Sequence, residues 1–252
     1  MSANSIPANY QADAALLKDR VILVTGAGQG LGKTAAMAYA LHGATVILLG
    51  RRQKKLEAVY DAIQMQGGPE PLIFPMDLEK LTDESAMAMA EGIYQQLGRL
   101  DGILHSAAHF DNLSPLEIQT GAQFSRMLQV NLVAPFAITK ACLPLLKQSA
   151  DAAILFTSTS NMHPSSAFWG SHGISKRAVE EMTHMWSLEL GQFPNLRVNT
   201  LLPGPIQSPQ RKKTHPGEIH ADLPQADALV PLYLYLMGPD SRDYSGQIFH
   251  KP

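Results

Sequence analysis

The sequence predicts one α/β domain in which helices cover both faces of a doubly wound parallel sheet. Short apolar runs alternate with longer amphipathic stretches over all 252 residues. The apolar runs lack a strict polar–apolar alternation, which is typical of strands buried on both faces. Regular alternation of such strands with helices favours a parallel, doubly wound sheet. Because no linker or block of charge divides the chain, we expect a single domain over residues 1–252.

The expected elements follow one another regularly as far as residue 202. The predicted strands cover residues 20–24, 44–49, 71–76, 100–105, 152–157, 196–202 and 247–249. The predicted helices cover residues 31–42, 52–65, 84–97, 123–147 and 171–190. Residues 1–15 are interpreted as an N-terminal arm. The proline-rich segment 203–224 interrupts the pattern and is predicted to be a mobile substrate loop or lid.

Composition and charge exclude several classes of protein. Apolar residues make up 45% of the chain, which is too much for a disordered protein. The net charge of −2 gives no electrostatic basis for binding nucleic acid or an anionic membrane. The single cysteine, Cys142, favours a reducing compartment, and no apolar run approaches the ~18 residues of a membrane span. The first 20 residues also lack the features of a signal peptide, so we expect a cytoplasmic protein.

A glycine-rich loop directly follows the first predicted strand, in Thr25-Gly26-Ala27-Gly28-Gln29-Gly30-Leu31-Gly32. Glycine lets the backbone turn at positive φ and approach a pyrophosphate without a Cβ in the way. The helix that begins near Leu31 directs its free N–H groups and its dipole to the same place. The spacing of Gly26, Gly30 and Gly32 is GxxxGxG, which fits neither GxGxxG nor a P-loop. The loop predicts a dinucleotide site, with a tight turn that binds no ligand as the alternative.

Two arginines follow the second predicted strand, in Leu49-Gly50-Arg51-Arg52, and no acidic residue occurs there before Glu57. A carboxylate near this position binds the ribose hydroxyls of NAD, whereas an arginine accommodates the 2′-phosphate of NADP. The sequence therefore predicts NADP(H) in preference to NAD(H), with solvated surface arginines as the alternative. Asp77-Leu78, after the third predicted strand, is placed to contact the adenine.

With these features, the chain resembles the short-chain dehydrogenase/reductase (SDR) family over nearly its full length. The TGxxxGxG loop, Asp77-Leu78, Val130-Asn131-Leu132, Ser175-Lys176 and Pro203-Gly204 occur in that family's order and spacing. Residues 22–27, 44–51 and 231–238 are similar to the YciK-type oxidoreductases. The resemblance implies a Rossmann-type, seven-stranded parallel sheet and hydride transfer between a nicotinamide cofactor and a carbonyl or alcohol. It also implies a homodimer or homotetramer, paired through helices 123–147 and 171–190.

The resemblance further implies which residues form the site. The cofactor contacts would be Thr25, Gly26, Gln29, Gly30, Leu31, Gly32, Arg51, Asp77, Leu78, Ser106, Ala107, Lys176, Pro203, Gly204 and Ile206. The family's catalytic set is Asn, Ser and Tyr-x-x-x-Lys. By position, Asn131 and Lys176 match this set, whereas His172 stands at the tyrosine position and Thr159 at the serine position. The family's Asn-Ala-Gly turn appears as Ser106-Ala107-Ala108.

The histidine at position 172 bears most directly on activity. Imidazole is a competent general acid or base near neutral pH. Its far nitrogen, however, lies roughly 2 Å nearer the backbone than a phenol oxygen would, by ordinary bond lengths. A misplacement of ~1 Å costs about 10²-fold in rate. A neighbouring Lys176 ammonium would also disfavour the protonated imidazole.

Other groups near the expected cleft could act in place of the phenol or shape the pocket. His109 and His163 lie in predicted loops and are possible proton donors. Met162, Phe168 and Trp169 would make the substrate pocket apolar. His105 and His109 lack partners at the spacing of a metal site, so no metal is predicted.

Three functions follow from these residues. The first is an NADP-dependent oxidoreductase that acts on a carbonyl or alcohol, with His172 or a water as proton donor. The second is a catalytically weak or inactive NADP(H)-binding sensor or scaffold, because both the tyrosine and the serine of the family's set are replaced. The third, a protein that keeps the fold and binds no cofactor, is disfavoured by the intact glycine loop.

Overall fold

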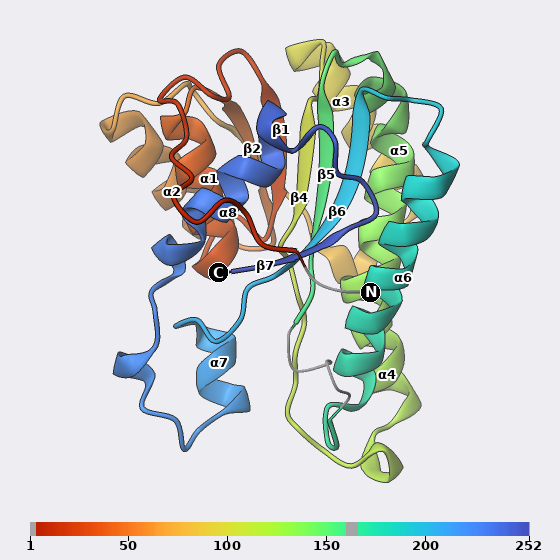
Figure 1. Cartoon of the computed structure of the whole chain (residues 1–252). Coiled ribbons are helices and arrows are strands. Elements are labelled where there is room, and N and C mark those ends of the chain that lie inside the picture. Colours follow the sequence, from red (N-terminus) through yellow and green to blue (C-terminus); the bar gives the residue numbers. More distant parts are fainter. Residues whose placement is uncertain (1–3, 160–165, 252) are drawn as a thin grey trace.

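The computed structural model describes residues 4–159 and 166–251, and its centre is a seven-stranded, all-parallel sheet (Figure 1). The strand order is β3-β2-β1-β4-β5-β6-β7. The strands are β1 (Val21–Thr25), β2 (Thr45–Gly50), β3 (Leu72–Pro75), β4 (Gly102–His105), β5 (Ala152–Thr157), β6 (Leu196–Leu202) and β7 (Ile248–His250). The predicted single-domain, doubly wound fold is confirmed. The order in which successive strands are added reverses between β1 and β4, which is the point where such sheets bind ligands.

Helices cover both faces of this sheet. Figure 1 shows α1 (Gly30–Leu41), α2 (Gln53–Met65) and α8 (Val230–Met237) on one side. On the other side lie α3 (Asp83–Leu97), α5 (Ala134–Gln148) and α6 (Gly170–Glu189), with α4 (Gly121–Leu128) continuing below them in that view. The bounds differ from the predicted ones by at most two residues, apart from the two segments described below, and those of β5 and β6 agree with the prediction at both ends.

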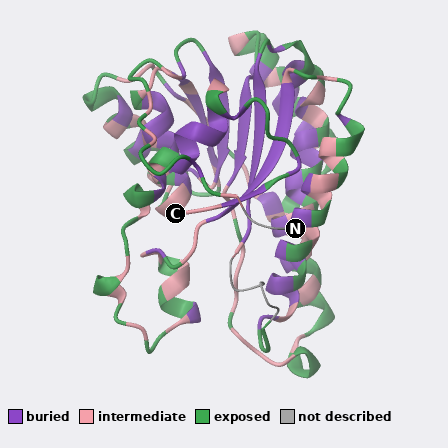
Figure 2. Cartoon of the chain, in the orientation of Figure 1, coloured by how far each residue is buried: buried purple, intermediate pink, exposed green. Residues whose placement is uncertain are grey.

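The core is divided by the sheet into two layers, which explains the uninterrupted apolar strands. In β1, Ile22 and Val24 pack into the layer under α1, α2 and α8, whereas Val21 and Leu23 pack into the layer under α3, α5 and α6. Since successive side chains of a strand point to opposite faces and both faces are covered, such a strand is apolar at nearly every position. Figure 2 shows the resulting buried sheet between half-exposed helices.

The predicted helix 123–147 is two helices joined by a π turn at Gln129–Val133. A π turn places one extra residue in a helical turn, and such turns occur frequently at functional sites. Asn131 lies in this turn and is buried. The continuous stretch Gly121–Gln148 is long and apolar enough to cross a membrane by length and composition alone. Its buried residues, among them Ile138 and Leu146, pack on the sheet as those of a core helix do.

Segment 203–224 is not the bare loop that the sequence predicted. It contains α7 (Pro209–Thr214), which the Ser208 side chain caps by accepting a hydrogen bond from the Arg211 N–H at 3.0 Å. A serine cap followed by proline at the first helical position is a regular helix start. Arg211 of the basic triplet also forms two hydrogen bonds with the Glu218 carboxylate, at 2.7 and 2.8 Å.

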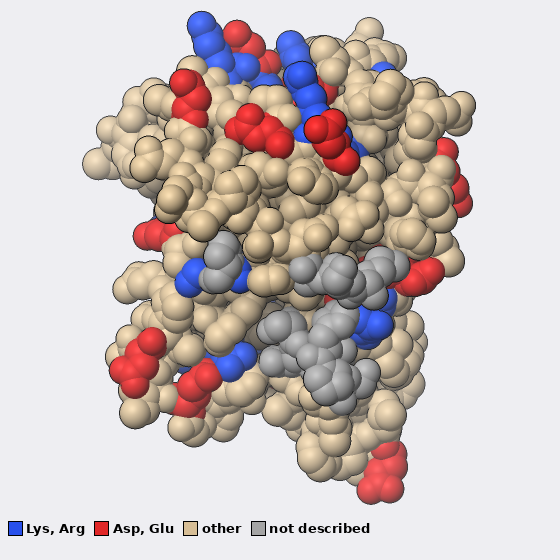
Figure 3. Space-filling view, viewed as in Figure 1, with Lys and Arg blue, Asp and Glu red and all other residues tan. Residues whose placement is uncertain are grey.

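The N-terminal arm is joined to the opposite end of the chain. Asn4 pairs in parallel with Phe249, and its N–H donates to the Ile248 carbonyl at 2.7 Å. Tyr10 packs edge-on against Tyr235 of α8, with ring centroids 5.1 Å apart. On the face drawn in Figure 3, acidic and basic side chains are interspersed rather than segregated.

Candidate functional site

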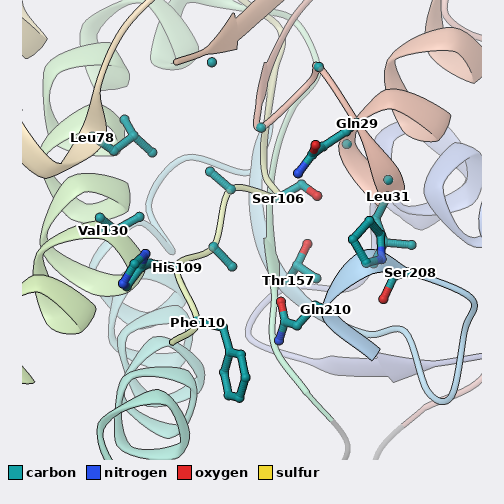
Figure 4. A pocket seen from close by; sticks show the side chains of 18 of the residues that line it. Gln29, Leu31, Leu78, Ser106, His109, Phe110, Val130, Thr157, Ser208 and Gln210 are labelled. Carbon is teal, nitrogen blue, oxygen red and sulfur yellow. The ribbon is translucent and has the colours of Figure 1, made fainter. Parts of the chain in front are cut away.

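A cavity of about 730 Å³ opens at the carboxyl ends of the strands. Its walls come from the segments that follow β1 to β6, so residues distant in sequence meet there. Figure 4 shows Leu78 and Val130 on one side of the cavity and Ser208 and Gln210 on the other. The volume falls within the ~300–1,000 Å³ of small-molecule and cofactor sites.

The cavity brings together nearly all the residues that the sequence singled out for a cofactor. Those that line it are Gly26, Gln29, Gly30, Leu31, Gly32, Arg51, Asp77, Leu78, Ser106, Ala107, Lys176, Pro203, Gly204 and Ile206. Thr25 does not line it. The Thr25 hydroxyl instead accepts the N–H groups of Ser106 and Ala107, both at 3.1 Å, and fixes the turn after β4.

Glycine is required at different positions of the loop for different structural reasons. A Cβ on Gly26 would lie 2.8 Å from the Cα of Ala107, and one on Gly32 would lie 2.4 Å from the Gly26 carbonyl oxygen. Gly30 has a φ of +55°, and the nearest atom to its position for a Cβ is Pro209 Cδ at 4.0 Å. Gly26 and Gly32 are therefore needed for packing, while Gly30 leaves the loop open toward the cavity. Helix α1 begins there without a side-chain cap, which leaves its first N–H groups available to a ligand.

Positive charge gathers in this cavity although the whole chain is slightly acidic. Its described lining contains the basic residues Arg51, Arg52, Lys55, Lys176, Arg211 and Lys213, and the acidic residues Asp77 and Asp111. Three of the basic residues follow β2, and the Lys55 ammonium donates to the side-chain carbonyl of Gln29 in the glycine loop. An excess of one charge within a low-dielectric cleft raises the local concentration of oppositely charged ligands.

Lys176 lies on α6 with its side chain buried. Its Nζ donates to the Thr157 carbonyl at 2.8 Å. Burial lowers the pKa of Lys176 to about 8, and the nearby Glu180 carboxylate opposes that shift. The ammonium form therefore still dominates at neutral pH.

His172, one helical turn before Lys176, is 1% exposed. Its Nδ1 lies 3.3 Å from the His109 carbonyl oxygen and 3.4 Å from the Asn131 Nδ2, and its Nε2 lies 3.3 Å from the Gln210 Nε2. Burial, followed by the Lys176 charge, lowers the pKa of His172 to about 3. The imidazole is therefore neutral at neutral pH.

The hydrogen bonds around Asn131 assign the tautomer of this neutral ring. The two Asn131 Nδ2 hydrogens have closer acceptors in the His109 carbonyl, at 3.0 Å, and the Ser175 hydroxyl, at 3.1 Å. The Asn131 Oδ1 accepts the His109 N–H at 2.7 Å. The His172 Nδ1 is thus left to donate to the His109 carbonyl, which leaves a lone pair on Nε2 facing the cavity. In this arrangement Nε2 accepts a hydrogen bond from the Gln210 amide.

The remaining predicted residues have varied positions. Thr159 lines the cavity, and Ser158 beside it donates to the Glu180 carboxylate at 2.5 Å. His109 also lines it, with its Nε2 2.9 Å from the Asp111 carboxylate. Trp169 lines the cavity, whereas Phe168 is 57% exposed and does not line it. The suggested roles of Met162 and His163 fall outside the described residues.

His105 takes no part in the cavity lining. It is buried, its Nε2 lies 2.9 Å from the Thr139 hydroxyl, and its ring stacks on Phe156. Over residues 4–159 and 166–251, no group of three or more His, Cys, Asp or Glu side chains could hold a metal ion.

Sequence reasoning missed several lining residues, among them Phe110, Thr157, Ser208 and Gln210. The Thr157 hydroxyl is buried and has no hydrogen-bond partner within the described part of the chain. The sequence could have identified Thr157 as a lining residue, because it ends a strand immediately before the predicted catalytic segment. Gln210 offered none, because its position depends on α7, which the proline-rich sequence concealed.

Comparison with known proteins shows the family of the chain. Residues 20–219 match the short chain dehydrogenase family. The chain belongs to this family. Relatives in the family span nearly its whole length: the "Uncharacterized oxidoreductase YciK" of Escherichia coli (strain K12) is 41% identical over 241 residues, which are 96% of this chain and 95% of that protein.

Two solved structures of this family's fold are similar to the chain throughout. The structure of the oxidoreductase yciK from E. coli has a TM-score of 0.92 at 40% identity, and the match covers 96% of this chain and 99% of that one. A protein of Shigella flexneri 2a, solved in complex with NADP, has a TM-score of 0.91 at 40% identity and covers 95% and 99%.

Proposed function

We propose that this short-chain dehydrogenase binds NADP(H) in the cavity and transfers a hydride between the cofactor and a small carbonyl or alcohol substrate. One observation carries the proposal. All the residues expected to bind the cofactor except Thr25 line the same cavity as Thr159, His172 and Lys176, three of the four residues expected to act on the substrate. The S. flexneri relative in complex with NADP supports the choice of cofactor.

The residues present fit a cofactor of that chemistry. Gly30 leaves open space where a pyrophosphate must approach the backbone, and the uncapped start of α1 offers N–H groups to it. The cations after β2, Arg51, Arg52 and Lys55, would hold a 2′-phosphate. They also underlie the proposed preference for NADP(H) over NAD(H), because a carboxylate at that place would repel the phosphate.

When bound, the nicotinamide supplies or accepts the hydride. Lys176, fixed by the Thr157 carbonyl and predominantly charged, would orient the ribose. Neutral His172, which we place at the family's tyrosine position, presents a lone pair at Nε2. In place of the Gln210 amide, it would accept a hydrogen bond from a substrate hydroxyl, or from the water that delivers the proton when a carbonyl is reduced. The Thr159 hydroxyl would hold the substrate oxygen.

The same histidine favours a second candidate function. An imidazole whose pKa is about 3 is a poor proton donor at neutral pH, because almost none of it is protonated. A protein that binds NADP(H) and turns over weakly or not at all, as a sensor or scaffold, would need no such donor. We propose this function as the alternative.

The assembly and setting of the protein are part of the proposal. We propose a cytoplasmic homodimer or homotetramer, paired through the surfaces of α4, α5 and α6. Exposed apolar side chains on α5 and α6, such as Phe136 and Met185, support pairing there. Segment 203–224, which carries α7, would be the substrate lid.

The test combines binding and turnover. Fluorescence titration with NADPH and NADH measures both affinities, and oxidation of bound NADPH is then followed with a panel of aldehydes and ketones. Tight NADPH binding with steady oxidation would support the oxidoreductase. Tight binding without oxidation would support the sensor. If neither nucleotide binds, both candidates are wrong.

A further inference from the structure

The cavity has a wall of aromatic rings beside His172. The ring centroids of Phe110 and Trp169 are 6.2 Å apart, and those of Trp169 and His172 are 5.8 Å apart. Phe110 meets His172 edge to face, at 5.2 Å and 88°. All three side chains line the cavity. Aromatic rings at such distances attract further rings through offset or edge-on contacts, beyond what their buried area provides.

The wall is held in place before any ligand arrives. The Phe168 carbonyl accepts the Ser114 N–H at 2.9 Å, and the Ser171 N–H donates to the Gln119 side chain at 3.1 Å. Trp169 lies between these two anchors and is 8% exposed. Phe168 has a φ of +70°, a conformation that non-glycine residues rarely adopt and that tends to occur at functional sites. Its strain is tolerated because the two hydrogen bonds fix the segment.

A polar pair accompanies the aromatic wall. The His172 Nε2 carries a lone pair, and the Gln210 Nε2, 3.3 Å away, carries hydrogens. Without a ligand the two atoms are hydrogen-bonded to each other, so a ligand that enters between them must replace this bond. An alcohol oxygen does so by donating to the His172 Nε2 and accepting from the Gln210 amide, whereas a hydrocarbon separates the pair and replaces nothing. Sites that hold a few polar groups in an apolar wall orient a ligand in this way.

We infer that the substrate is an aryl carbonyl compound or the corresponding benzylic alcohol, with its planar ring against Phe110 and Trp169. The alcohol oxygen would lie between His172 and Gln210, whereas the carbonyl oxygen would accept from Gln210 and be joined to the His172 Nε2 through the hydrogens of a bridging water. The inference rests on the proposed function, since it names the substrate class of that same cavity. The aryl carbonyl would take a hydride from NADPH and a proton from water to give the benzylic alcohol, NADP⁺ and a hydroxide that returns to solvent, or the reaction would run in reverse.

The test compares two alcohols of nearly equal size, benzyl alcohol and cyclohexylmethanol. Both are measured with and without NADPH, which cannot oxidise an alcohol, so binding is observed without turnover. Saturation-transfer NMR and displacement titrations give the dissociation constants. We expect benzyl alcohol to bind roughly threefold to tenfold more tightly, which is the range of aromatic-pair energies.

Variants assign the preference to the wall. Trp169→Leu should bring the ratio of the two dissociation constants close to one. Trp186→Leu is the matched control, because Trp186 stacks on Phe136 away from the cavity and its loss should leave the ratio unchanged. If Trp169→Leu does not fold, Phe110→Leu provides the same comparison.

The outcomes separate this inference from the proposed function. If NADPH binds but cyclohexylmethanol binds as well as benzyl alcohol, or neither alcohol binds, the aryl substrate class is wrong and the cofactor site stands. A preference that survives Trp169→Leu also overturns it. If NADPH fails to bind while the Trp169-dependent preference holds, the proposed function is wrong and the aromatic site stands.

Discussion

The cofactor end and the substrate end of the cavity are built by different means. At the cofactor end the backbone itself forms the surface, and a Cβ added to Gly26 or Gly32 would lie under 3 Å from neighbouring main-chain atoms. At the substrate end the side chains of His172, Asn131 and Gln210 meet through hydrogen bonds of 3.0–3.3 Å, two of them to the His109 carbonyl in the segment after β4. The first end tolerates little change, because an added Cβ has no room to move. The second can adjust by rotating side chains, so substitutions there should have graded effects.

The strongest way to break the cofactor end is Gly30→Asp. The new carboxylate would fill the open space at the loop and repel a pyrophosphate, so we expect the NADPH affinity to fall by at least about 10²-fold. Fluorescence titration measures the change. Gly67→Asp is the matched control, because Gly67 also has a positive φ, of +77°, and is far from the cavity. It shares the backbone strain of about 1–3 kcal/mol but should bind NADPH normally. Unchanged affinity in Gly30→Asp would contradict the cofactor site.

At the substrate end, the buried neutral histidine should make stability depend on pH. The pKa of His172, and that of buried His105, are lowered from 6.5 to about 3 by burial. The unfolded chain therefore binds more protons than the folded one between pH 6.5 and 3, and the free energy of unfolding falls as the pH falls through that window. At pH 5 the loss is on the order of 2 kcal/mol for each histidine.

Urea denaturation at pH 7.5 and pH 5 tests this prediction. His172→Gln should lose less stability between the two pH values than the unaltered protein, by about 2 kcal/mol, because only His105 remains. Groups unaffected by the substitution cancel in that difference. Equal losses in both proteins would show that His172 is protonated in the folded state.

A smaller loss of NADPH affinity is expected when the two arginines where the cofactor end meets solvent are replaced. Replacing Arg51 and Arg52 together by alanine should raise the dissociation constant of NADPH about tenfold and leave that of NADH unchanged, because only the 2′-phosphate differs. Lys33→Ala removes a cation outside the cavity and serves as the control. A parallel loss of NADH affinity would mean that the arginines do not select the phosphate.

The smallest expected change is a gain at the substrate end. His172→Tyr combined with Gln210→Ala supplies a phenol and removes the amide that lies 3.3 Å from the imidazole. We expect NADPH oxidation with an aryl aldehyde to rise severalfold, since the phenol reaches further and can donate a proton. Gln210→Ala alone is the control. No gain over that control would mean that the phenol is not the only missing part.

The same contrast explains what the sequence could predict. Each strand is a short run of residues that all favour a buried strand, such as Val21 to Thr25, and the glycine loop follows the first strand directly in the chain. Local pattern therefore determined the fold and most of the cofactor lining. The meeting of His172 with Gln210 joins residues 38 apart in the chain, and it depends on a two-turn helix stabilised by its cap and its ion pair. The neutral state of His172 likewise arises from burial, which residue order does not reveal.

The π turn at Gln129–Val133 determines how far α4 is rotated about the helix axis relative to α5. An α-helix turns about 100° per residue, so one extra residue rotates α4 by that angle about the helix axis relative to α5. Asn131 faces the His109 backbone because of this offset. The site therefore requires this number of residues between the two helices. Gain or loss of one residue there would rotate the outer face of α4 by about 100° and turn the Asn131 carboxamide away from the site.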